Sequence, residues 1–75
     1  MPMSIVDLQR RQPGTRADEL LDALQADVAP DERVCWNETG HARLSIGGEI
    51  EDARAALAAR LDQVGGDWAD HIAIL

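Results

Sequence analysis

The feature that most constrains the fold is a long amphipathic segment at residues 48–64. Its apolar residues recur at spacings of three and four, which places them on one side of an α-helix at ~100° per residue. These residues are Ile50, Ala53, Leu57, Leu61 and Val64. Carboxylates open the segment, where they favour the positive end of the helix dipole, and Gly65-Gly66 follows it. The pattern predicts a helix with one buried side, which the rest of the chain must cover.

A second helix is predicted at residues 15–28. Pro13-Gly14 breaks the chain just before it, and Pro30 prevents its continuation. An apolar stripe recurs at helical spacing through Ala17, Leu20, Leu21, Leu24 and Val28. The polar residues between them, Gln25 included, are expected to face away from this stripe.

Three further segments alternate between apolar and polar residues, as strands do. Residues 33–37 and 42–46 predict a β-hairpin, with Gly40 in the turn. Residues 69–75 predict a last strand. Residues 3–9 suit a strand with one wetter face because Val6 and Leu8 alternate with Ile5, Asp7 and Gln9. Ser4 with Asp7 could instead open a short helix.

The predicted order is therefore strand, helix, strand, strand, helix, strand. One domain of this order is an α+β, ferredoxin-like βαββαβ sandwich, with two helices on one face of an antiparallel sheet. If residues 3–9 are not a strand, the fold is αββαβ instead. The 75 residues include two Trp and no Phe or Tyr, so the core is thin and binding to a partner or a second copy is favoured.

The net charge of −7 disfavours direct binding to nucleic acid, because that interaction depends on neutralising phosphates. A protein partner with a basic surface is favoured instead. The acidic residues predicted to meet it are Asp18, Glu19, Asp22, Asp27, Glu49, Glu51 and Asp52. We expect a cytoplasmic protein that does not contact a membrane, since no signal peptide or apolar run of about 20 residues is visible.

A second candidate surface is the sheet face opposite the helices. The alternation of the hairpin directs Val34, Trp36, Leu44 and Ile46 towards the helices. The opposite face would then show four candidate partner-binding side chains, Cys35, Asn37, His41 and Arg43, with Ser45 beside them. A sheet face of this kind can also be simply solvated.

Residue types that serve as metal ligands and catalytic groups are present, but their spacing is not that of a catalytic or metal-binding motif. Cys35, His41, Asp70 and His71 lack the close-paired spacing of a zinc site. A Cys35–His41 pair would be a nucleophile and base without an orienting third group. The sequence therefore predicts no metal, no cofactor and no enzymatic activity.

Pro13-Gly14, between a first strand and a first helix, is similar to the turn of ACT domains, which are ferredoxin-like regulatory modules. The resemblance covers these two residues and the predicted topology, and Arg16 stands where that family usually has an apolar residue. It implies a dimeric domain that senses small ligands.

The prediction that the composition favours is a small acidic protein-binding module that regulates or inhibits a larger partner. In size and charge the chain is similar to inhibitors encoded by phages and plasmids, including some anti-CRISPR proteins, which occupy basic surfaces. The ACT-like sensor is the alternative, and an oligomer of two copies is compatible with both.

Overall fold

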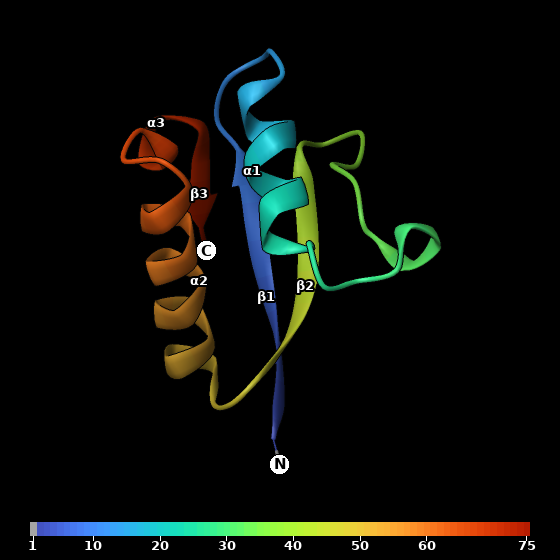
Figure 1. The fold of residues 1–75 in the computed structure, drawn as a ribbon, viewed down its shortest axis with the longest axis vertical. Helices are drawn as coiled ribbons and strands as arrows, with labels where there is room; N and C mark the ends of the chain where they lie inside the picture. Colours follow the sequence, from blue (N-terminus) through green and yellow to red (C-terminus); the bar gives the residue numbers. More distant parts are fainter. Residues whose placement is uncertain (1) are drawn as a thin grey trace.

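The computed structural model describes residues 2–75 and arranges them in two layers, a three-stranded sheet and a layer of helices on one of its faces (Figure 1). The sheet is antiparallel, in the order β2-β1-β3. The strands are β1 (Met3–Arg10), β2 (His41–Gly47) and β3 (Ile72–Ile74), and the main helices are α1 (Arg16–Leu24) and α2 (Ile50–Val64). A 3-10 helix, η1 (Pro30–Glu32), and a short helix, α3 (Trp68–His71), complete the α+β fold.

The central strand β1 confirms the prediction of a strand at residues 3–9, so the αββαβ alternative is wrong. Val6 and Leu8 are fully buried beneath the helices because alternate side chains of a strand point to the same face. Val6 lies opposite Leu44 of β2, and Leu8 lies opposite Ile74 of β3. One short run of alternating residues thus supplies the middle of the core.

The two helices bury the stripes that the sequence predicts, but each is shorter than expected. The centre of the α2 stripe is fully buried, whereas Ile50 and Val64 at its ends are 37% and 42% exposed. In Figure 1 the two helices run in opposite directions, and the Arg60 side chain of α2 donates to the Leu24 carbonyl at the end of α1 (3.0 Å). No helix among residues 2–75 has both the length and the apolarity needed to cross a membrane.

The predicted strand at residues 33–37 is wrong. The Val34 N–H donates to Gln25 Oε1 (2.7 Å), and Gln25 Nε2 donates to the Val34 carbonyl (2.9 Å). A side-chain amide therefore satisfies both backbone groups of Val34 without a neighbouring strand. Only the turn end of the predicted hairpin remains, where the Asn37 N–H donates to the His41 carbonyl (2.8 Å).

Gln25 itself lies where the sequence did not place it. Helical spacing directs it outwards with the acidic residues of α1, yet it is 2% exposed. The reason is that α1 ends at Leu24, and the Gln25 N–H bonds to the Asp22 carbonyl in a tighter turn. Its side chain turns inwards and also donates to the Leu21 carbonyl (3.3 Å).

The predicted last strand at residues 69–75 is correct only in its second half. Residues 68–71 form α3, and β3 begins at Ile72. Asp67, just before α3, accepts two hydrogen bonds from Arg16 of α1 (2.9 and 3.1 Å). This contact joins the start of α1 to the end of the chain, and it holds the pKa of the Asp67 carboxyl below its usual value.

Replacing Gln25 with alanine tests the role of its amide. We expect the Gln25→Ala variant to lose about 1–3 kcal/mol of unfolding free energy, because the partly buried backbone groups of Val34 lose their partners. Urea unfolding followed by circular dichroism measures this loss. Gln63→Ala, at an exposed position of α2, is the matched control and should change stability by less than about 0.5 kcal/mol. Equal effects of the two substitutions would contradict the role of Gln25.

The Asp67 contact predicts a pH dependence of stability. Because the pKa of folded Asp67 lies below its unfolded value near 3.8, this contribution is present above that value. It is lost as the pH falls through the folded pKa. Between about pH 5 and pH 2, the unfolding free energy of Asp67→Asn should fall less than that of the wild type. Urea unfolding at a series of pH values measures both slopes, with Asp31→Asn, an exposed site on η1, as the control. Parallel curves for Asp67→Asn and the wild type would refute the contact.

Candidate functional site

The sheet face away from the helices carries an apolar patch that is open to solvent. Met3 and Ile5 of β1 are 64% and 66% exposed, because they alternate with the buried Val6 and Leu8. Their cross-strand neighbours on β2 are Gly47 and Ser45, which are too small to cover them. We call Met3 and Ile5 the apolar patch of the helix-free face.

Charged side chains lie directly beside this patch, one step further along β1. Asp7 lies opposite Arg43 of β2, and Asp7 Oδ1 is 3.1 Å from His41 Nδ1. The Asp7 and His41 side chains are both about one-third exposed or less, so this pair is partly shielded from water. The helix-free face therefore combines an apolar half with a charged half.

The structure places the four predicted residues of this face in two different settings. His41 and Arg43 lie on β2 and face away from the helices, as the alternation of the strand requires. Cys35 is exposed in the irregular segment before β2. The Asn37 side chain closes the turn, accepting from the backbone N–H groups of Thr39 (2.9 Å) and His41 (3.0 Å). Cys35 and Asn37 do not lie on the predicted sheet face, because residues 33–37 do not form a strand.

The apolar patch is the part of the face that the sequence analysis missed. Its signal was available, since Met3 and Ile5 occupy the positions that alternate with Val6 and Leu8. Large apolar residues on both sides of a strand indicate either a doubly covered strand or an exposed patch. The structure shows the second case.

The seven predicted acidic residues are all exposed, but they form two groups on the helix layer. The first lies on and just after α1, and the second lies at the start of α2. Because Leu24 contacts Arg60, the start of α2 lies roughly 15 Å further along the helix axis than the end of α1. Within the first group, Glu19 Oε1 is 3.3 Å from Arg16 Nη1, so the guanidinium partly neutralises the charge of Glu19. The members are Asp18, Glu19, Asp22 and Asp27 in the first group, and Glu49, Glu51 and Asp52 in the second.

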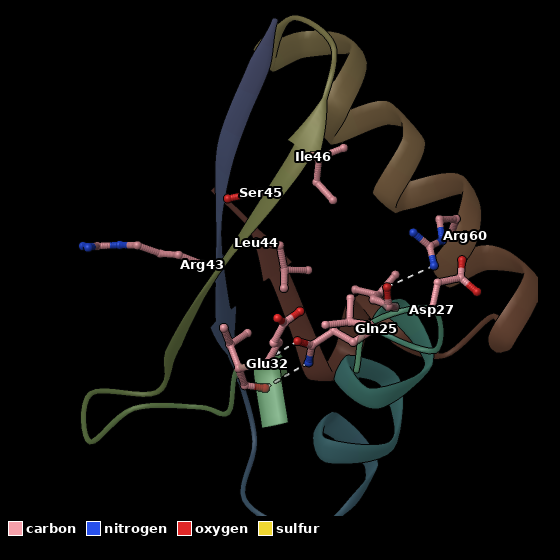
Figure 2. A pocket seen from close by; sticks show the side chains of 11 residues that line it. Gln25, Asp27, Glu32, Arg43, Leu44, Ser45, Ile46 and Arg60 are labelled. Atoms are coloured by element: carbon pink, nitrogen blue, oxygen red, sulfur yellow. Dashed lines mark hydrogen bonds between the residues drawn. The ribbon is translucent and has the colours of Figure 1, made fainter. Parts of the chain in front are cut away.

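A groove of about 300 Å³ lies between β2 and the ends of the helices (Figure 2). Leu44 and Ile46 of β2 point into it, and Gln25 and Arg60 lie across from them. Arg43 points away from the groove in the same view. The groove occupies the side of β2 along which the predicted strand would have run.

Among residues 2–75, no group of three or more His, Cys, Asp or Glu side chains is placed to hold a metal ion. The His41 ring contacts Asp7 and lies on the helix-free face. His71 is in α3, and its Nε2 lies 3.5 Å from Asp67 Oδ2.

Because the apolar patch is exposed, a substitution there should change the unfolding free energy less than a substitution in the core. We expect Ile5→Thr to change the unfolding free energy by less than about 0.5 kcal/mol, because Ile5 is already in water. Val6→Thr, the matched change at the neighbouring buried position, should cost about 1–3 kcal/mol because it buries a hydroxyl group. Urea unfolding of the two variants measures both. A large loss in Ile5→Thr would show that Ile5 belongs to the core.

No protein family, curated protein or solved structure matches the chain. What these surfaces do is therefore inferred from the chemistry of this chain alone.

Proposed function

We propose that this protein is a non-enzymatic protein-binding module that regulates or inhibits a larger partner. The observation that supports this most strongly is the apolar patch, where Met3 and Ile5 are each almost two-thirds exposed. Leaving large apolar side chains in water forgoes favourable burial, and apolar patches rimmed by polar groups are typical of protein contacts.

The charged half of the same face would orient a bound partner. Asp7 and His41, 3.1 Å apart, and Arg43 offer both signs of charge at fixed positions beside the apolar half. A partner that covers Met3 and Ile5 must also match this pattern, since unpaired charges at an interface are costly. The face thus favours a specific contact over a non-specific apolar one.

The acidic helix layer adds attraction at longer range. With a net charge of −7 and two exposed acidic groups on the helices, the molecule is attracted to a basic protein surface. Occupation of such a surface would block whatever else binds there, which is how a small acidic inhibitor of the anti-CRISPR kind would act. In this proposal the charge accelerates association, and the helix-free face makes the contact.

We also propose that the fold is ferredoxin-like with one edge strand unformed. The strand order β2-β1-β3 and the antiparallel pairing are those of the predicted sandwich without its strand at residues 33–37. That strand would have lain outside β2, next to the groove.

Site-specific photo-crosslinking tests the proposed contact. We expect the full chain with p-benzoylphenylalanine in place of Ile5 to form a covalent adduct with one protein in a lysate of its native host. The same group in place of Gln63, an exposed residue on the helix layer, is the matched control and should not form that adduct. Equal crosslinking from both positions, or none from position 5, would overturn the assignment of this face.

The same experiment tests the acidic helix layer. Asp18→Arg with Asp22→Arg reverses two exposed charges and spares Glu19, which contacts Arg16. This variant should form the adduct at position 5 more slowly at low salt and at a nearly unchanged rate at high salt, because screening removes long-range attraction. A rate that is unaffected at low salt would remove the acidic surface from the proposal.

A further inference from the structure

The outer edge of β2 exposes backbone groups in a pattern that two hydrogen bonds define. The Arg10 N–H donates to the Gly40 carbonyl (2.7 Å), and the Gly48 N–H donates to the Pro2 carbonyl (2.9 Å). In an antiparallel ladder such bonded pairs recur at every second residue. The even-numbered residues of β2 therefore direct their backbone groups at β1. The odd-numbered residues direct theirs away from it.

The outward groups at the start of β2 are satisfied, and those that follow are not. The His41 N–H donates to Asn37 Oδ1 (3.0 Å), and the His41 carbonyl accepts from the Asn37 N–H (2.8 Å). Over residues 2–75, nothing bonds to the outward N–H and C=O groups of Arg43, Ser45 and Gly47. These three exposed residues form the open edge of β2.

Residues 33–37, the predicted neighbouring strand, bond to this edge only at His41, through Asn37. The Gln25 side chain binds both backbone groups of Val34. Native proteins usually block an edge strand with charge, proline or a covering loop. Here Arg43 is the one charged side chain on the edge, and it points to the helix-free face (Figure 2).

We propose that the open edge of β2 binds the same edge of a second copy of this chain, antiparallel, about a two-fold axis at Ser45. In that register Ser45 lies opposite Ser45 of the second copy, and Arg43 lies opposite Gly47. All three outward residues of each copy are then paired, and each pair exchanges two hydrogen bonds. The result is one continuous sheet across the two copies, which is a self-complementary contact of the kind that two-fold dimers use.

Registers shifted towards the start of β2 pair its outward groups less favourably. A shift of the axis to Leu44 places Gly47 opposite His41, whose outward groups already bind Asn37. A shift to Arg43 places two arginines directly opposite each other, which is destabilising. Of the registers about Arg43, Leu44 and Ser45, the one about Ser45 is therefore the one that the charges and the free backbone groups favour.

The side chains fit this register on both faces of the sheet. On the helix side, Leu44 lies opposite Ile46 of the second copy, so apolar groups meet where the groove is lined by Leu44 and Ile46. On the helix-free face, two serines meet at the axis, and each Arg43 meets a glycine. Gly47 and Gly48 also leave space beside the Asn37 turn of the second copy, because neither has a side chain.

This contact is separate from the proposed partner-binding face, so either inference can fail alone. The pairing lies in the plane of the sheet, whereas Met3 and Ile5 project from its helix-free face. A dimer built in this way presents two apolar patches on the same side.

Disulfide trapping of the full chain tests the register. In a Cys35→Ser background, Ser45→Cys brings two thiols together across the axis. The expected Cα separation of about 5.5 Å suits a disulfide. Arg43→Cys in the same background is the matched control, because its two copies would lie roughly 13 Å apart. Mild oxidation should link Ser45→Cys at least tenfold faster than Arg43→Cys. Faster linking at position 43 would overturn the register.

Sedimentation equilibrium tests the dimer itself. The wild-type chain should form dimers reversibly, and Ser45→Asp should raise the dissociation constant at least tenfold because two carboxylates then face each other. Gln9→Asp, an exposed change on the central strand, is the control and should leave the constant unchanged. Circular dichroism confirms that each variant is folded. A wild-type chain that stays monomeric at millimolar concentration, or a dimer that Ser45→Asp leaves intact, would overturn the proposal.

Discussion

The pairing of one side-chain amide with one backbone residue fixes the path of the chain between α1 and β2. Gln25, 2% exposed at the end of α1, donates to the Val34 carbonyl and accepts from the Val34 N–H. A glutamine amide has the donor and acceptor of a peptide group, so it can replace a neighbouring strand for one residue. This replacement satisfies the partly buried backbone groups of Val34 and holds the segment that follows α1 against the end of that helix. The sheet ends at β2, with its outer edge free.

The sheet presents two independent surfaces. The edge of β2 offers backbone groups in the plane of the sheet, and the helix-free face offers Met3 and Ile5 perpendicular to it. If the edge joins two copies, the two faces lie side by side, and a partner with repeated sites would be bound with increased avidity. The thin core of a 75-residue chain is then extended across two copies, and the groove beside Leu44 is closed.

The sequence predicts the parts of the fold that depend on local periodicity. Alternation placed Val6 and Leu8 in a buried strand, and helical spacing placed Leu20 and Leu57 in the core. The prediction of a strand at residues 33–37 is wrong for a physical reason. Alternation shows that a segment has an apolar and a polar side, but it does not show which group bonds to its backbone. That group, Gln25, lies nine residues before Val34, and the prediction placed it outside because it extended the helix to residue 28, past its end at Leu24. The apolar patch could have been read from the same alternation that identified β1.

Amide hydrogen exchange, measured residue by residue by NMR, tests most directly whether Val34 is bonded by Gln25 while the edge of β2 is open. The Ser45→Asp variant is suited to it, because a charge at the axis keeps the edge free of a second copy. The account predicts slow exchange at Val34 and Leu44, whose N–H groups are bonded, and nearly unprotected exchange at Arg43 and Gly47. Protection at Arg43 equal to that at Leu44 would contradict it, because a strand would then cover the edge of β2.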